Sequence, residues 1–300
     1  MQKYLYLFLL TASFAQVSDY TYTGSQASAM AGAIVSEKGG NWSIFHNPAG
    51  LAEIDGNQFS AGGGNLFGVN WLSSYHINGV MPLQEIGIIG FALQQMGTKY
   101  SGTTLSIEQT LSVAHGFDLQ HDKNSHLAIG YTTNFIQWDL GNSAGISGDG
   151  SDGWELGSVH SVTIDFGIVA SLREKYRFGV FLKNINSGAL GKGITRQVLP
   201  RRINTGITYM PMTGLSTSIV SENLLGRDDL QIKGAIRYNL NTILIIYAGA
   251  QFNPNRIGFG FKLNFSNLND LVDNNLTFTY SLLSHPVLPM TQQISIGFEL

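Results

Sequence analysis

The sequence predicts an all-β protein, a 14-stranded antiparallel transmembrane β-barrel with an N-terminal plug or hatch. Three observations predict this fold. Only 12% of the 300 residues are charged, about half the level usual in a soluble domain. The chain holds 36 glycines, and 11% of its residues are aromatic. Many segments alternate large apolar residues with small polar ones, as strands do when one face meets lipid and the other a polar lumen.

The composition excludes several classes of protein. A net charge of −3 argues against a nucleic-acid-binding surface, which needs a basic patch. The absence of cysteine from the sequence excludes disulfides, thiol nucleophiles, cysteine metal sites and a lipoprotein anchor. No stretch reaches the ~20 apolar residues of a transmembrane helix.

Residues 1–15 are expected to be a secretory signal peptide. Lys3 precedes an apolar run from Tyr4 to Leu10, and Ser13-Phe14-Ala15 is a small-x-small cleavage site. An ordinary N-terminal helix is the alternative, but the polar residues that follow offer it no amphipathic continuation. We therefore expect an exported mature chain that begins at Gln16.

Residues 16–56 are expected to form a plug segment. The stretch 24–56 lacks strand alternation, is rich in small residues, and has a weak helical pattern around 27–35. Its large apolar residues favour a segment packed inside the lumen, because a disordered tail carries few of them. A periplasmic tail is the alternative. The large apolar residues are Trp42, Ile44, Phe45 and Leu51.

Residues 57–300 are expected to form the barrel. The clearest alternation lies in 256–265, where Ile257, Phe259 and Phe261 alternate with Gly258 and Gly260. Fourteen such segments can be drawn, an even number as in single-chain bacterial barrels. They are 57–67, 73–81, 86–95, 105–117, 126–138, 158–171, 176–185, 203–210, 214–222, 230–239, 243–252, 256–265, 275–283 and 291–300. We expect the first segment to pair with the last, because lipid tolerates no free sheet edge.

The lengths of the connections agree with a periplasmic N-terminus. The two longest, 139–157 and 186–202, then lie outside the cell, whereas most periplasmic turns are short. The exceptions are 118–125 and 266–274, which are longer than a tight turn.

Six basic residues are expected to point into the lumen, because lipid-facing charge costs about 2–4 kcal/mol at the bilayer midplane. Glu108, Asp165 and Glu299 are expected to point inward too. The cations can either pack the plug through ion pairs or receive an anionic head group. They are Arg177, Lys183, Lys233, Arg237, Arg256 and Lys262.

Apolar residues in the connection 284–290 suggest a site for partner binding at the extracellular rim, together with the two long connections. His285, Val287, Leu288 and Met290 lie there, stiffened by two prolines. Exposed apolar groups commonly mark a partner or membrane site. The alternative is that they fold over the barrel mouth.

Catalytic and metal sites are not expected. Asp118, His121, Asp122 and His126 crowd one connection, but no regular element is expected to bring them together, so a solvated turn is favoured. The acidic loop 148–153 lacks the distal Glu of a calcium loop. The sequence has no Gly-x-Ser-x-Gly elbow, so we expect neither an enzyme nor a cofactor, and an outer-membrane hydrolase is a minor alternative.

Several short motifs carry a family resemblance. Residues 28–33 and 41–52, which include Asn47-Pro48-Ala49-Gly50, are the most specific, and weaker matches run from Asp165-Phe166-Gly167 to the C-terminus. This set resembles FadL-type outer-membrane proteins, and more closely their PorV/PorQ relatives. The final Leu300 is a departure, since many such barrels end in Phe.

The resemblance implies an outer-membrane location in a diderm (Gram-negative) bacterium and two possible functions. PorV-like members belong to the type IX secretion system, so the chain would bind or shuttle secreted cargo at its rim. FadL members instead carry hydrophobic small molecules across the membrane. The inward faces are mostly Gly, Ser, Thr and charge, which leans toward a sealed barrel and the first function. Expected partners are outer-membrane lipids with secretion proteins or a hydrophobic molecule.

Overall fold

The structure is a computed structural model that describes residues 21–83, 86–100, 102–143, 145–148, 151–193, 196–226, 229–266 and 275–300. The expected signal peptide, residues 1–15, lies outside the described residues, as does most of the connection 266–274. Among the described residues, no helix is long and apolar enough to cross a membrane.

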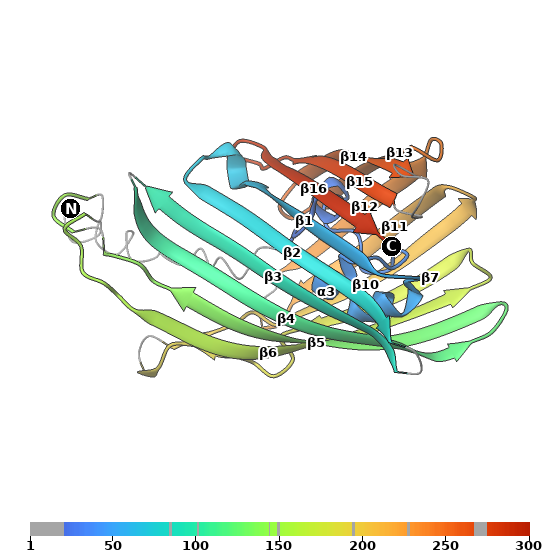
Figure 1. Cartoon of the computed structure of the whole chain (residues 1–300), viewed down its shortest axis with the longest axis horizontal. Helices are drawn as coiled ribbons and strands as arrows, with labels where there is room; N and C mark the ends of the chain where they lie inside the picture. Colours follow the sequence, from blue (N-terminus) through green and yellow to red (C-terminus); the bar gives the residue numbers. More distant parts are fainter. Residues whose placement is uncertain are drawn as a thin grey trace.

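Fourteen strands of the described chain form one closed antiparallel barrel (Figure 1), which confirms the expected fold class. Each wall strand pairs with the wall strands that precede and follow it in the sequence. The short hairpin β8–β9 forms a separate sheet, so β7 pairs with β10. The wall strands are β1 (Gln58–Asn65), β2 (Leu72–Leu83), β3 (Gly87–Tyr100), β4 (Thr103–His121), β5 (Ser125–Asp139), β6 (Ser158–Leu172), β7 (Tyr176–Lys183), β10 (Arg202–Met212), β11 (Leu215–Leu224), β12 (Leu230–Asn239), β13 (Leu244–Phe252), β14 (Arg256–Ser266), β15 (Asn275–Leu283) and β16 (Thr291–Glu299).

The barrel closes between its first and last strands, as expected. Gln58 lies opposite Glu299, and Gly63 lies opposite Ile294. The closure leaves no strand of the wall with an entirely free edge, so backbone groups that lipid cannot satisfy find partners within the sheet.

The outer surface of the barrel is apolar. Ile257 is 69% exposed and Ile219 is 63% exposed, and Phe59, Ile77 and Leu93 are exposed in the same way. Their inward neighbours are small or polar, so the strands alternate as a lipid-facing wall does.

The connection expected at 118–125 is much shorter than the sequence suggested. Strand β4 continues to His121 and β5 begins at Ser125, so only 122–124 form the turn. A bulge between Asp118 and Gln120 interrupts the pairing of the two strands. The bulge adds a residue and breaks the alternation of apolar and polar positions. The end of the hairpin therefore cannot be recognised from the alternation alone.

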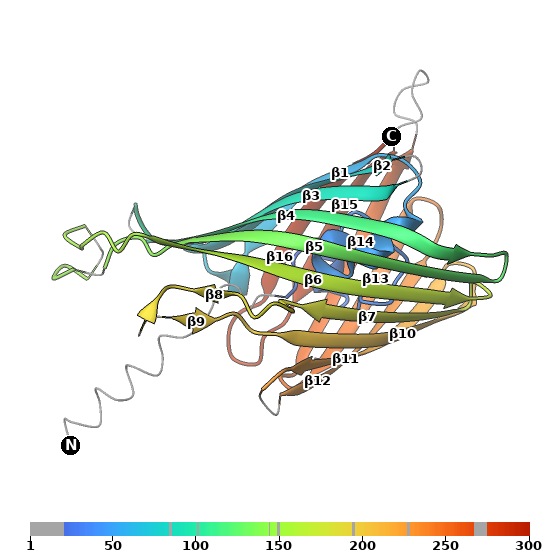
Figure 2. The same cartoon turned by 90° about the horizontal axis from the view of Figure 1, so that it is seen from below.

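The wall is tall on one side. Strands β4, β5 and β6 have 19, 15 and 15 residues, whereas β1 and β7 have eight each. Figure 2 shows β4 to β6 running well past the rest of the barrel at the end that carries the long connections. The hairpin of β8 (Ala189–Leu190) and β9 (Gln197–Val198) lies at this end, where Leu190 and Leu199 pack against Ile136.

The segment before β1 lies within the barrel, and we call residues 24–56 the inner segment. It holds α2 (Ser25–Ala29), α3 (Ser43–His46) and the 3-10 helix η2 (Pro48–Glu53), while a second 3-10 turn, η3 (Leu66–Gly68), connects β1 to β2. Helix α2 contacts β13 to β16, and η2 contacts β3 to β6. These strands form opposite sides of the barrel, so the inner segment crosses the lumen (Figures 1 and 2).

Candidate luminal site

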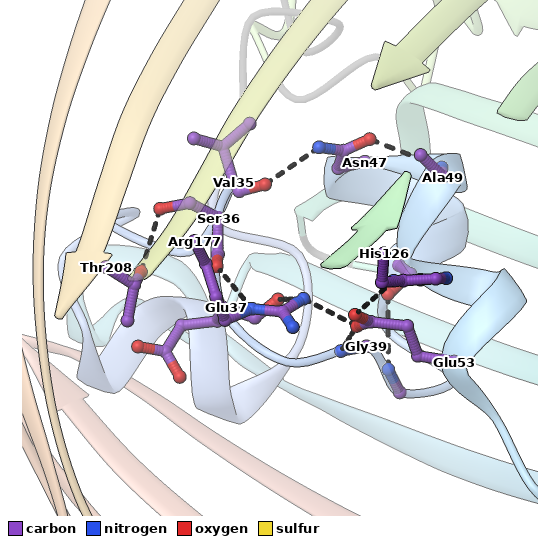
Figure 3. Close-up of polar contacts among 12 residues, drawn as sticks. Val35, Ser36, Glu37, Gly39, Asn47, Ala49, Glu53, His126, Arg177 and Thr208 are labelled. Carbon is purple, nitrogen blue, oxygen red and sulfur yellow. Dashed lines mark hydrogen bonds and ion pairs between the residues drawn. The ribbon is translucent and has the colours of Figure 1, made fainter. Parts of the chain in front are cut away.

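Residues 47–50 form a tight turn that joins two parts of the inner segment to the wall. Asn47 is extended, as expected of a residue that precedes proline, and its side-chain oxygen accepts from the Ala49 amide at 3.3 Å. Its amide nitrogen donates to the Val35 carbonyl at 2.8 Å and to the Ile168 carbonyl at 3.2 Å. Asn47 therefore binds the start of η2, the preceding loop and β6 at once; Figure 3 shows its contacts with Ala49 and Val35.

Three glycines of the wall strands lie directly against this turn. A Cβ on Gly116, Gly130 or Gly167 would lie 2.6, 2.4 or 2.1 Å from the nearest atom of Asn47 or Pro48. Since real Cβ atoms do not approach so closely, only glycine fits at these three inward positions. We call them the glycine socket. The alternation places all three residues toward the lumen but does not reveal that they meet at one turn.

Glu53 and Arg177 form a buried ion pair between η2 and β7. Arg177 Nη2 lies 2.6 Å from Glu53 Oε2, and Arg177 Nε donates to the Ser36 carbonyl at 3.0 Å. The Gly39 amide also donates to Glu53 Oε2, at 2.8 Å. Burial alone would raise the pKa of Glu53, but the hydrogen bond from His126 and the charge of Arg177 outweigh it and lower the pKa to about 2. The carboxylate is therefore charged at neutral pH.

A second acid of the inner segment contacts β11 and β12, two and three strands away from β7. Glu37 Oε1 accepts from Ser216 and Ser218 at 2.9 and 2.6 Å, and Arg237 Nη1 lies 3.6 Å from Glu37 Oε2. Ser36, the preceding residue, shares a 2.8 Å hydrogen bond with Thr208 of β10. The inner segment is thus held from several strands.

The other expected luminal cations also face the interior. Lys233 pairs with Glu222 at 2.7 Å and lies over the Tyr22 ring, 5.5 Å from its centroid. Arg256 lies 5.0 Å from the same ring centroid. Lys262 lies 3.8 Å from Glu299, and Lys183 lines the luminal cavity described next.

A small cavity of about 70 Å³ separates the inner segment from strands β3 to β7, β10, β11 and β12. Its lining is mixed: Ile34, Ile44 and Phe181 are apolar, whereas Asp165 and Lys183 are charged. His46 also lines it, and burial lowers the pKa of His46 to about 4. The neutral imidazole therefore donates its Nε2 proton to the Thr23 carbonyl, 2.8 Å away.

The wall beside this cavity contains a seam. Strand β7 pairs with β6 only from Phe166 to Leu172, so β6 continues beyond the end of β7. There the Asn186 side chain takes the place of a strand, since its oxygen accepts from the Ile164 amide at 3.1 Å and its nitrogen donates to the Val162 carbonyl at 2.9 Å. We call this junction the β6–β7 seam.

Asp118, His121 and His126 come together at the short-turn end of the barrel, contrary to the expectation that no element would gather them. The β4–β5 pairing places His121 opposite His126, and the bulge turns Asp118 toward both. One potential ligand atom from each residue lies within 4.8 Å of the others.

The rim connection 284–290 presents its apolar residues outward. Val287 is 86% exposed, and Leu288 and Met290 are exposed as well. His285 anchors the loop, because its Nδ1 accepts from the Val287 and Leu288 amides at 3.2 and 3.0 Å and its ring packs against Phe67. Trp154, in the long connection after β5, is also exposed.

A closed barrel with an apolar outer face and a polar inner face is the architecture of a membrane-spanning β-barrel. A scan against protein-family models finds no match for the chain, and a search of curated proteins finds no significantly similar sequence. Solved structures, in contrast, share its fold over nearly the whole length.

Three of these structures define the fold type. The monoaromatic hydrocarbon channel CymD has a TM-score of 0.64 at 11% identity, covering 93% of this chain and 97% of CymD. The toluene transporter TbuX of Ralstonia pickettii has a TM-score of 0.59 at 12% identity, covering 94% and 98%. A FadL homologue of Pseudomonas aeruginosa has a TM-score of 0.52 at 11% identity, covering 92% and 97%.

The chain therefore has the fold of FadL-like outer-membrane barrels. The likeness supports the FadL-like part of the sequence resemblance and leaves the PorV/PorQ part a proposal. Two of the proteins with this fold are named as a monoaromatic hydrocarbon channel and a toluene transporter.

Proposed function

We propose that this protein is a passive channel for hydrophobic small molecules across the outer membrane. The observation that carries the proposal is the fold, a closed 14-stranded barrel that is shared with a monoaromatic hydrocarbon channel and a toluene transporter. This was the alternative interpretation of the sequence, and the fold favours it over the secretion role.

The inner segment is the plug of this channel in our proposal. The luminal cavity of about 70 Å³ is less than half the size of an apolar cavity that accepts benzene, about 150 Å³. A hydrocarbon can therefore enter this cavity only when plug side chains move. The β6–β7 seam beside the cavity offers a sideways exit, because side-chain hydrogen bonds open more readily than a strand ladder.

The luminal cations hold the plug in this proposal instead of receiving an anionic ligand. Arg177 and Arg237 pair with the acids of the inner segment, and Lys233 and Arg256 lie over the Tyr22 ring. Residues 47–50 and the glycine socket fix its other end.

An uptake assay tests the channel. Cells that lack their own hydrophobic channel should take up radiolabelled toluene faster when they express this barrel. The natural chain has no cysteine, so Ser36→Cys with Thr208→Cys introduces two thiols alone. Because the native hydroxyls are 2.8 Å apart, the pair is close enough for a disulfide. Oxidation should then lower uptake to the level of cells without the barrel.

The same double variant after reduction is the matched control and should regain wild-type uptake. Equal toluene uptake with and without the barrel would overturn the channel. Uptake that survives oxidation would instead show that this part of the plug does not have to move.

Binding of partner proteins at the rim is the second candidate function, in keeping with the PorV/PorQ resemblance. The exposed side chains of 284–290 favour it, since Val287, Leu288 and Met290 form an apolar group on a loop that His285 stiffens. A stiff loop loses little entropy when it binds.

Replacing Val287, Leu288 and Met290 together by serine should weaken capture of outer-membrane partners by the tagged barrel without changing its heat-modifiable migration on gels. The three side chains are exposed, so their loss should leave the wall intact. Mass spectrometry of the captured proteins measures the effect. Unchanged capture would show that the loop only covers the barrel mouth and does not bind partners. Failed barrel assembly would show that these residues are needed for folding and would remove the support for partner binding.

A further inference from the structure

A cluster of metal-ligating side chains lies on the β4–β5 hairpin, away from the luminal cavity. His126 Nε2 lies 2.5 Å from Asp118 Oδ1, and His121 Nδ1 lies 3.2 Å from Asp118 Oδ2. The two imidazole rings are 5.0 Å apart between centroids. Three donors from three residues therefore converge on one point at the short-turn end of the barrel.

The chemistry of these donors selects a particular class of cation. Two imidazoles and one carboxylate suit Zn²⁺ and its transition-metal neighbours, whereas Mg²⁺ and Ca²⁺ prefer oxygen donors. Bonds of about 2.0–2.1 Å in a tetrahedral site put ligand atoms roughly 3.3 Å apart. Entry of a metal thus needs the His126–Asp118 contact to open by less than about 1 Å. The most widely separated donor atoms, which lie within 4.8 Å of one another, have to approach by up to about 1.5 Å.

Mobility within the cluster permits this adjustment. The His121 side chain is 72% exposed, so it can rotate to complete the site, and the fourth position is open to water. The His126 side chain is only 10% exposed and is held in place.

What holds His126 is the second observation that points to a metal. Its Nδ1 lies 3.4 Å from Glu53 Oε1, on the side of the ring opposite the cluster. Metal-bound histidines almost always donate their other ring N–H to a carboxylate or carbonyl group, which fixes the ring and its tautomer. Glu53 is itself fixed by Arg177 and the Gly39 amide, as Figure 3 shows.

We propose that Asp118, His121 and His126 bind a Zn²⁺-class divalent cation, with Glu53 as the positioning residue of His126. The site joins the wall hairpin to the inner segment through the His126–Glu53 contact. A bound metal would therefore connect β4 and β5 to η2 and strengthen the hold on the plug segment.

A zinc titration of the folded barrel tests the proposal. The full mature chain, purified in detergent through a tag that contains no histidine, is titrated with Zn²⁺ against a chromophoric chelator. We expect one equivalent to bind, with no competition from a large excess of Mg²⁺. His121→Ala should weaken binding at least about tenfold, and Glu53→Gln should weaken it roughly 10–100-fold while one equivalent still binds.

His160→Ala is the matched control, since His160 is an exposed histidine on β6 outside the cluster, and it should bind Zn²⁺ as the wild type does. Zinc-edge X-ray absorption should show two imidazole ligands. Equal affinity in wild type and His121→Ala would overturn the site, and His121 is exposed enough that this variant should fold. Unchanged affinity in Glu53→Gln would overturn the positioning role.

Discussion

Replacement of Arg177 by methionine is expected to destabilise the closed barrel by about 3–5 kcal/mol, since breaking a buried pair leaves an uncompensated charge. The stranded group is Glu53, whose side chain is 9% exposed. The variant also loses the hydrogen bond to the Ser36 carbonyl. Denaturant unfolding of the refolded barrel measures the loss, and planar-bilayer recordings should show a higher conductance as the inner segment loosens.

Arg173→Met is the matched control, because Arg173 is an exposed cation in the turn before β7 and exposed pairs contribute little. It should leave stability and conductance unchanged. If Arg177→Met behaved like this control, the ion pair would have no part in holding the inner segment.

The same pair predicts how stability depends on pH. The folded pKa of Glu53, about 2, lies below its ordinary value of about 4.3. Its contribution is therefore fully present above the unfolded pKa and is lost as pH falls toward 2. Unfolding followed between pH 6 and pH 2 should show this loss in the wild type.

Gly130→Ala is expected to be the most disruptive single methyl addition at the glycine socket, and to cost about 1–3 kcal/mol by overpacking. Its Cβ would lie 2.4 Å from the Pro48 carbonyl carbon and 2.6 Å from the Ala49 amide nitrogen. Both are backbone atoms, so no flexible side chain can make room. The inner segment must move, which limited proteolysis of 24–56 and bilayer conductance both detect.

Gly234→Ala provides the comparison, because the nearest atom to its Cβ would be the Ser218 carbonyl oxygen at an ordinary 3.8 Å. We expect no change in protease resistance for this variant. Equal resistance in Gly130→Ala would mean that the socket is not needed to seat the turn at 47–50.

The sequence alone allowed the barrel to be predicted because alternation is a local signal. Ile257 and Phe259 reveal the lipid face without knowledge of any partner strand. The socket could not be found in this way, since Gly116, Gly130 and Gly167 come together only after β4, β5 and β6 align beside Pro48. The cluster of Asp118 and His126 depends on a bulge, whose extra residue reverses the facing of everything beyond it. The local pattern therefore predicts the strands of the barrel wall. Contacts between segments that are distant in the sequence can be seen only in the structure.

The unequal strand lengths give the barrel a slanted rim. At about 3.3 Å per residue, β4 is about 60 Å long and β7 about 26 Å. The wall is therefore more than twice as high at β4 as at β7. Where 15-residue β6 meets 8-residue β7, the ladder must run out of partners. The seam sealed by Asn186 is thus a step in the rim, and in the proposed channel a molecule leaving there would pass out sideways at the low edge of the wall, not over its top.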